Sequence, residues 1–95
     1  MIRSFADKRT AAVWNDRVPK GYPSDLAKVS RRKLRMLAAA TRLEDLRSPT
    51  ANRLEALVGS RAGQHSIHIN DQWRLCFIWR DGDAHDVEIV DYHRG

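Results

Sequence analysis

The chain has 95 residues, of which 42% are hydrophobic and 31% are charged, and its formal net charge is +5. This balance describes one globular domain over residues 1–95 and excludes a disordered chain. No apolar run approaches the roughly 20 residues of a membrane-spanning helix, and the first residues lack the apolar stretch of a signal peptide. We therefore expect a cytoplasmic protein without a membrane partner. Its basic excess favours polyanions, either nucleic acid or an acidic protein.

The first half of the chain has helical patterns. Asp7 is a candidate N-cap for a short helix over Lys8–Asn15. The prolines and glycine of the segment VPKGYPSD then predict a loop. A longer helix is expected over residues 24–40, with Ser24 and Asp25 available to cap its start.

Four cations share one face of this longer helix, opposite its apolar stripe. They recur at i, i+3, i+4 and i+7, at Lys28, Arg31, Arg32 and Arg35. Like charges at this spacing repel by a few tenths of a kcal/mol per pair, so the arrangement mildly destabilises the free protein. The stripe is either a solvated surface or a binding surface for RNA phosphates or an acidic partner.

From Gln64 onward the hydrophobic period changes to two. The segments HSIHI, WRLCFIWR and HDVEIVD predict three strands, joined by turns at residues 70–72 and 81–83. An antiparallel meander with two helices on one face follows, and Ile2–Phe5 is expected to add an edge strand. The single cysteine, Cys76, lies within the central strand and is interpreted as a small core residue.

The register of these strands decides which side chains meet. A turn at Gly82–Asp83 would place Arg74 opposite Asp91, and the first hairpin would place His68 beside Arg74. These three residues would then share one face of the sheet. A three-residue loop with a bulge is an alternative, and a slip of one residue exchanges the faces. In either register Arg74 reaches the C-terminal segment Asp91–His93.

Three stretches of the sequence carry a resemblance to a known family. They are MIRSF at the start, NRLEALVGSRAGQHSIHINDQWRLCFIW in the middle and VEIVDYH at the end. Together they resemble the HigB branch of the RelE superfamily of bacterial toxins, over nearly the whole chain. The resemblance implies an α+β fold, in which two N-terminal helices pack on a small curved antiparallel sheet.

The resemblance also implies a function and partners. Such a toxin of a type II toxin–antitoxin system cleaves messenger RNA in the ribosomal A site, which inhibits translation. It uses neither a metal nor another cofactor. A HigA-type helix-turn-helix antitoxin neutralises it, and the toxin–antitoxin complex binds operator DNA.

Metal-free RNA cleavage uses the 2′-hydroxyl as nucleophile, so it requires a base, a cation at the phosphate and an acid for the leaving 5′-oxygen. The resemblance assigns the phosphate to Arg74, whose planar fork suits phosphate oxygens. His93 is the candidate acid because imidazole titrates near neutrality. Tyr92 would stack on a base or hydrogen-bond the phosphate, and Asp91 would orient His93 or hold the arginine. Further candidate contacts to RNA are Arg61 and His68.

Glu55 departs from the pattern of some HigB relatives, which carry a histidine within the string HPLK where this chain has EALV. Relatives of the YoeB type use a glutamate here as general base, so Glu55 is our candidate base. The alternative is an exposed helix carboxylate. Val58 replaces the lysine of the string, which leaves Arg74 and Arg61 to supply the positive charge. Two functions therefore remain open: an endoribonuclease, and a weakly catalytic or non-catalytic module that acts with its antitoxin in operator repression.

Overall fold

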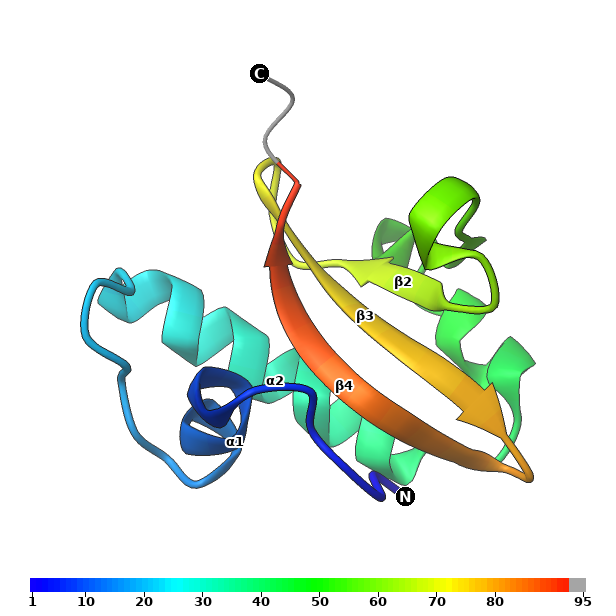
Figure 1. Ribbon diagram of the computed structural model, residues 1–95, viewed down its shortest axis with the longest axis horizontal. Helices are drawn as coiled ribbons and strands as arrows, with labels where there is room; N and C mark the ends of the chain where they lie inside the picture. The colour runs from blue at the N-terminus through cyan, green and yellow to red at the C-terminus, as the bar shows by residue number, and fades with distance from the viewer. Residues whose placement is uncertain (93–95) are drawn as a thin grey trace.

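The computed structural model describes residues 1–92 as two helices on one face of a four-stranded antiparallel sheet (Figure 1). The helices are α1 (Lys8–Trp14) and α2 (Ser24–Ala39). The strands, in their order across the sheet, are β1 (Glu55–Ala56), β2 (His65–His68), β3 (Trp73–Arg80) and β4 (Asp83–Asp91). Short 3-10 helices lie at η1 (Leu43–Arg47), η2 (Thr50–Asn52) and η3 (Gly59–Arg61). The predicted α+β class is confirmed, and β1 adds a strand to the expected meander.

The two helices begin in different ways. Asp7 caps α1 as predicted, because its carboxylate accepts a hydrogen bond of 2.8 Å from the backbone N–H of Thr10. The expected side-chain caps of α2 are absent from the described residues. Its N-cap is Pro23, which has no side-chain acceptor, and Ser24 and Asp25 lie inside the first turn. None of the helices within residues 1–92 is long and apolar enough to cross a membrane.

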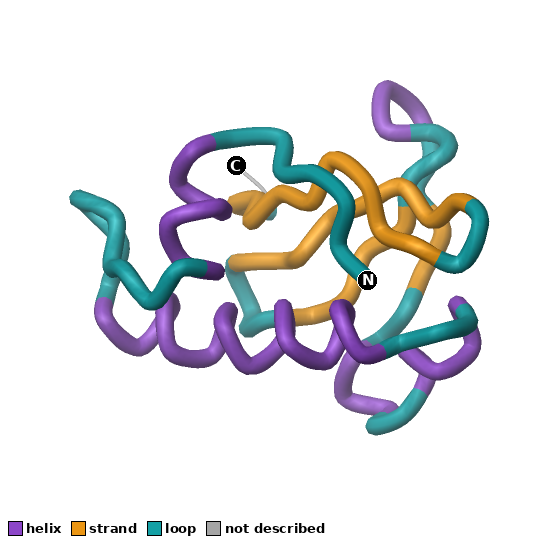
Figure 2. The backbone as a smooth tube through the Cα atoms, turned by 90° about the horizontal axis from the view of Figure 1, so that it is seen from below, coloured by secondary structure: helices purple, strands orange, loops and turns teal. Residues whose placement is uncertain are grey.

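The hydrophobic core lies between α2 and the sheet (Figure 2). Leu34 and Leu37 of α2 are fully buried, and so are Ile67 and Leu75 on neighbouring strands. Each such side chain stabilises the fold by about 1.5–3 kcal/mol when it leaves water. Because the helices cover one face of the sheet, residues that alternate with this core point to the opposite face. That opposite face carries the candidate site.

The hairpin between β3 and β4 turns one residue earlier than predicted. Its central residues are Asp81–Gly82, with φ angles of 54° and 80°, and Arg80 pairs with Asp83. Positive φ at both central positions is the requirement of a tight type I′ turn, which Asp-Gly satisfies well. The predicted turn at Gly82–Asp83 is therefore wrong.

A bulge changes the register again between this turn and the end of the hairpin. The ladder shifts between Cys76 and Ile78, and Asp86 on β4 has a φ of 50°. The result is that Arg74 pairs with Val90, whereas Asp91 pairs with Trp73. Asp91 therefore does not share a face with Arg74, which corrects the prediction. The predicted pairing of His68 with Arg74 is confirmed.

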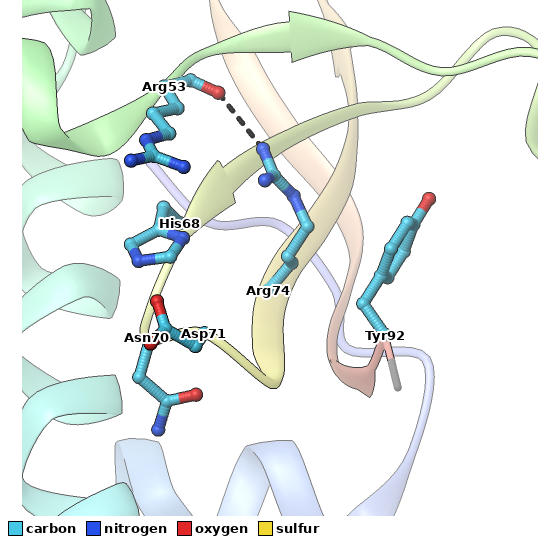
Figure 3. A pocket seen from close by; sticks show the side chains of 6 residues that line it. All are labelled: Arg53, His68, Asn70, Asp71, Arg74 and Tyr92. Atoms are coloured by element: carbon cyan, nitrogen blue, oxygen red, sulfur yellow. Dashed lines mark hydrogen bonds between the residues drawn. The ribbon is translucent and has the colours of Figure 1, made fainter. Parts of the chain in front are cut away.

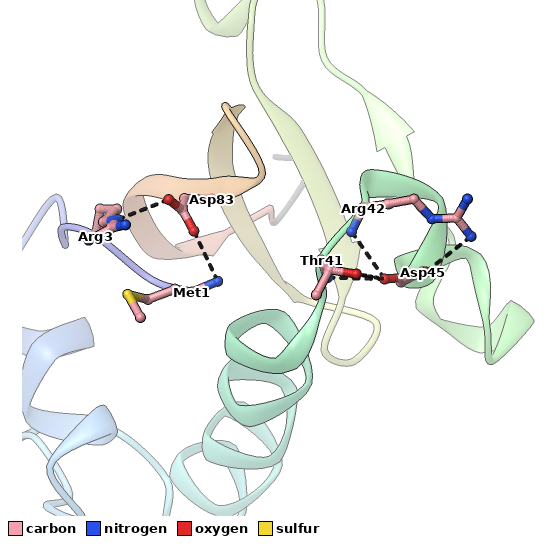
Figure 4. Close-up of polar contacts among 6 residues, drawn as sticks. All are labelled: Met1, Arg3, Thr41, Arg42, Asp45 and Asp83. Atoms are coloured by element: carbon pink, nitrogen blue, oxygen red, sulfur yellow. Dashed lines mark hydrogen bonds and ion pairs between the residues drawn. The ribbon is translucent and has the colours of Figure 1, made fainter.

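The N-terminal segment runs beside β4 without forming a regular strand. Two isolated parallel bridges, Ile2 to Ala84 and Phe5 to Val87, replace the predicted edge strand. The Nε of Arg3 donates to the carboxylate of Asp83 at 2.9 Å (Figure 4). This hydrogen bond lowers the pKa of Asp83. The segment thus covers the outer edge of the sheet.

A carboxylate also stabilises the turn after α2. The backbone N–H groups of Thr41 and Arg42 both donate to the carboxylate of Asp45, at 3.0 and 3.1 Å (Figure 4). These two hydrogen bonds are the main cause of the lowered pKa of Asp45. The turn starts the chain back toward β1 and the candidate site.

Candidate active site

Arg74 on β3 is the best-positioned cation of the open sheet face. Its Nε donates to the buried Ser66 hydroxyl at 2.7 Å, and its Nη2 donates to the backbone carbonyl of Arg53 at 2.9 Å. The side chain is only 11% exposed. Its Nη1 has no hydrogen-bond partner among residues 1–92, so this nitrogen can bind an incoming anion. The guanidinium is therefore held in place before any ligand arrives.

Glu55 lies next to this arginine. It does not belong to a helix, because β1 pairs with β2 and places Glu55 opposite Ser66. One carboxylate oxygen, Oε1, lies 2.9 Å from Nη2 of Arg74. The side chain is 57% exposed, so it can reach a substrate in solvent. Glu55, Arg74 and Tyr92 all line one hollow of about 230 Å³.

A second hollow of about 150 Å³ adjoins the first, and the two share Arg74 and Tyr92. Its other lining residues are Arg53, His68, Asn70 and Asp71 (Figure 3). Burial is the largest cause of the lowered pKa of His68, and the neighbouring guanidinium groups of Arg53 and Arg74 lower it further. These causes favour the neutral imidazole of His68 over the imidazolium, and the neutral ring can donate one hydrogen bond.

The end of the chain contributes unequally to the site. Tyr92 lies on the same face as Arg74, and the guanidinium carbon is 5.8 Å from the centre of its ring. Asp91 points to the other face, where it accepts a hydrogen bond of 3.1 Å from the side chain of Gln72. His93, the candidate acid, lies outside the described residues. Of the predicted C-terminal cluster, Tyr92 is thus the described residue beside Arg74.

Arg61 lies on η3 and is already paired. Its Nη1 is 3.3 Å from the carboxylate of Glu88 and donates to Gln64 at 3.0 Å. Cys76, which pairs with Glu88 across the sheet, is fully buried, and burial raises the pKa of its thiol to about 11. A protonated, inaccessible thiol is a poor nucleophile, so Cys76 offers no nucleophile to this face.

Comparison with known proteins identifies the family. A family model of HigB-like toxins, described as the RelE-like toxin of the type II toxin–antitoxin system HigB, matches residues 3–93. The chain belongs to this family. Toxin HigB-1 of Vibrio cholerae is 40% identical over 95 residues, which cover 99% of each chain. The protein named Endoribonuclease HigB of Proteus vulgaris is 32% identical over 94 residues, which cover 98% of this chain and 100% of that protein.

A solved structure agrees on the fold. YafQ from Escherichia coli superposes with a TM-score of 0.61 at 13% identity, over 97% of this chain and 94% of that chain. Such low identity shows the shared fold alone. Membership of a type II toxin family implies an antitoxin partner for this HigB-like chain.

The cations of α2 divide into two kinds. Arg31 is bound by α1, because its Nε donates to the carbonyl of Val13 at 3.1 Å and its Nη1 lies 3.1 Å from the carboxylate of Asp16. The exposed members of the stripe, which line a shallow hollow with Arg31, are Lys28, Arg32 and Arg35. In this HigB-like fold Arg31 holds the two helices together, and the other three remain available to a partner.

Three residues of the site were missed by sequence reasoning. Ser66 fixes Arg74, Arg53 lines the second hollow, and Lys33 lies buried behind it. Lys33 stands on the buried face of α2, three residues after the buried Ser30, and this position was a usable signal. Ser66 and Arg53 gave no such signal, because their roles depend on how β1 and β2 pair.

Proposed function

We propose that this chain is an endoribonuclease toxin that cleaves messenger RNA in the ribosomal A site. The observation that carries the proposal is the contact between Glu55 and Arg74, a solvent-accessible carboxylate beside a fixed guanidinium. When a 2′-hydroxyl attacks the adjacent phosphorus, the reaction first needs two groups: a base and a phosphate-binding cation. The name of the Proteus vulgaris relative, an endoribonuclease, supports the same activity.

In the proposed reaction, Glu55 accepts the proton of the 2′-hydroxyl while its oxygen attacks phosphorus. Arg74 binds a non-bridging oxygen through Nη1 and stabilises the negative charge that grows there. The phosphorus–5′-oxygen bond then breaks, which leaves a 2′,3′-cyclic phosphate and a free 5′-hydroxyl. Neither step requires a metal, because the guanidinium supplies the positive charge.

The departing 5′-oxygen needs a proton. We assign that role to His93 on the family resemblance, with Asp91 as a residue that could orient it. The ring of Tyr92 faces Arg74 and offers a stacking surface for a base beside the reacting phosphate. Arg61 would add positive charge once RNA competes with Glu88 for its guanidinium.

The partners follow from charge and from the family. The exposed stripe of α2, Lys28, Arg32 and Arg35, would contact phosphates of the ribosome, with Arg31 behind it. The antitoxin would be a HigA-type helix-turn-helix protein. Through it the complex would bind operator DNA and repress its own synthesis.

A second function has one observation in its favour. Val58 is 85% exposed and lines the hollow beside Glu55, at the position where the family pattern has a lysine. A missing cation weakens stabilisation of the pentavalent phosphorus. The alternative is therefore a weakly catalytic or non-catalytic module that acts with its antitoxin in repression. An endoribonuclease remains the better reading, because Arg74 and Glu55 are both in place.

The decisive experiment expresses the chain from a tightly regulated promoter in cells without the antitoxin. Wild-type chain should arrest growth and produce new transcript 5′ ends within codons. Glu55→Gln preserves side-chain size and the bond from Arg74 but cannot accept the proton, so cleavage should fall by roughly a hundredfold or more.

Glu44→Gln is the matched control, since Glu44 is an exposed carboxylate on η1 and makes the same charge change. It should cleave like the wild type. Should the wild-type chain leave growth and transcripts unchanged while it still binds its antitoxin, the binding module would replace the enzyme as the conclusion.

A further inference from the structure

We propose that the hollow lined by Arg53, His68 and Arg74 binds the RNA phosphate that follows the scissile one on its 3′ side. This inference rests on the proposed function and adds a second phosphate site to it. The ligand class is a phosphodiester or terminal phosphomonoester of a short single strand. Four observations support it: the lining residues, the backbone of Arg53, the buried Lys33 and the position of Glu55.

The lining of the hollow carries a positive charge. Arg53 and Arg74 both face it, and Asp71 is the carboxylate among its lining residues (Figure 3). The side chain of Arg53 makes no ion pair within residues 1–92, although Asp71 lies in the same lining. A neutral His68 adds a hydrogen-bond donor without opposing an anion. A phosphate oxygen would thus meet two guanidinium groups and an imidazole.

The backbone of Arg53 is held in an unusual conformation. Its φ of 47° and ψ of 55° lie in the left-handed region, which disfavours a residue with a Cβ. Such strain persists where surrounding contacts impose it. Here the carbonyl of Arg53 accepts the hydrogen bond from Arg74, and the side chain lies over His68 in the hollow (Figure 3). One residue thereby orients the catalytic arginine and lines the second site.

A buried lysine stabilises this arrangement from behind. Lys33 is 7% exposed, and its Nζ donates to the side-chain oxygen of Asn52 at 2.6 Å. Asn52 immediately precedes Arg53 and also donates to the carbonyl of Leu46 at 3.2 Å. No carboxylate pairs with this ammonium group among residues 1–92, and its positive charge is one of those that lower the pKa of His68 in the hollow.

The chemistry of the reaction gives the site its direction. In-line displacement places the attacking 2′-oxygen and the departing 5′-oxygen on opposite sides of phosphorus. Glu55, the base, lines one hollow, and Arg53 with His68 line the other, while Arg74 and Tyr92 belong to both. With Glu55 as the base in one hollow, our proposal directs the 5′-oxygen toward the other hollow. The nucleotide attached to that oxygen then carries the next phosphate toward Arg53 and His68.

The test measures binding of 2′-O-methyl dinucleotides, which cannot be cleaved, to the full chain. Three probes are compared: one with free ends, one with a 3′-phosphate and one with a 5′-phosphate. Wild-type chain should bind the 3′-phosphorylated probe roughly tenfold more tightly than the unphosphorylated one, since charged hydrogen bonds add this much. In NMR spectra of the chain, the amide resonances of Asn70 and Asp71 should shift when the 3′-phosphorylated probe binds. The 5′-phosphate should increase affinity by a smaller factor.

Arg53→Gln should remove the gain from the 3′-phosphate and leave the gain from the 5′-phosphate unchanged. Arg42→Gln makes the same charge change on an exposed arginine away from the hollow and should change neither. Arg53→Gly is the second variant, because glycine adopts the left-handed backbone freely and keeps the carbonyl aimed at Arg74. Both Arg53 variants should behave alike.

The results separate this site from the proposed function. A 3′-phosphate gain that survives both Arg53 variants, or no shift at Asn70 and Asp71 at millimolar probe, overturns the site even if the chain cleaves RNA. If the 3′-phosphate increases affinity only when Arg53 is present, but the chain cleaves no RNA, the second phosphate site is supported and the endoribonuclease proposal is refuted.

Discussion

The chain carries two groups of cations that differ in how the fold holds them. Arg74 is 11% exposed, with Ser66, Glu55 and the Arg53 carbonyl around its guanidinium. Arg32 and Arg35 on α2 are exposed, and neither has an ion-pair partner within residues 1–92. One group is fixed in direction, and the other is free to follow its partner.

The difference separates two uses of positive charge. A fixed guanidinium can stabilise charge that develops at one atom, because it needs no reorganisation during the reaction. Mobile surface charges attract a polyanion from any direction and lose strength with added salt. The sheet face is therefore suited to chemistry and the helix face to association. Substitutions that preserve charge should damage the first and spare the second.

Arg74→Lys should have the largest effect. It keeps the charge, but an ammonium cannot contact Ser66, Arg53 and a phosphate oxygen together as the planar fork does. We expect RNA cleavage to fall by about a hundredfold to a thousandfold, the usual cost of losing a fixed donor to a developing oxyanion. Single-turnover cleavage on ribosomes measures it. Arg35→Lys, the same exchange on the helix face, should cleave normally, and equal losses in both variants would refute the distinction.

Ser66→Ala should have a smaller effect on the same face. Ser66 is fully buried, and its hydroxyl accepts the Nε hydrogen bond of Arg74 at 2.7 Å. Without it the guanidinium can rotate, so the cleavage rate should fall by about tenfold at unchanged ribosome affinity. The free energy of unfolding should fall by about 1–2 kcal/mol, measured by urea denaturation. Ser66→Thr retains the hydroxyl, so it should cleave RNA faster than Ser66→Ala does. An unchanged cleavage rate in Ser66→Ala would remove Ser66 from the site.

The sequence predicted the regular elements of this fold more reliably than the contacts between them. Periodicity located α1, α2 and the three longer strands, and Asp7 was correctly identified as a cap. The two-residue strand β1 is too short to show any periodicity, so the sequence left open that Glu55 is an exposed helix carboxylate. Its contact with Arg74 became visible only through the pairing of Glu55 with Ser66.

The C-terminal part of the site illustrates the same limit. The turn at Asp81–Gly82 and the bulge at Asp86 together move Asp91 off the face of Arg74 and leave Tyr92 on it. A register in a hairpin depends on where extra residues enter, and Asp-Gly-Asp is compatible with several turns. The sequence therefore identified which residue types gather at this end of the sheet. The structure was needed to show that Tyr92, and not Asp91, shares a face with Arg74.

Neutralising Arg32 and Arg35 together should weaken association moderately. Arg32→Gln with Arg35→Gln removes two exposed cations without disturbing α1, whereas Arg31→Gln would break the contacts to Val13 and Asp16. Ribosome affinity should fall several-fold at low salt, and the slope of log affinity against log salt should decrease by about 1.4–1.8, which is two phosphate contacts. Cleavage of bound ribosomes should be unchanged. An unaltered salt slope would exclude the stripe from binding.

The smallest expected effect concerns the protonation of His68. Its pKa is lowered from the ordinary value of 6.5, first by burial and then by Arg53 and Arg74, with Lys33 adding to them and Asp71 opposing. The unfolded chain therefore holds more protons between the two pKa values, so stability rises with pH through that window and falls on acidification below 6.5. His68→Gln should flatten this part of the stability curve.

An NMR titration of the His68 ring measures the pKa directly. It should lie below that of the exposed histidine in a denatured reference, and it should rise in Arg53→Gln because one neighbouring cation is gone. Bound phosphate should raise it further, since an anion in the hollow favours the imidazolium form. A His68 pKa that does not change in Arg53→Gln would mean that this guanidinium does not act on the hollow, and the sheet face would lose part of the fixed charge that distinguishes it from α2.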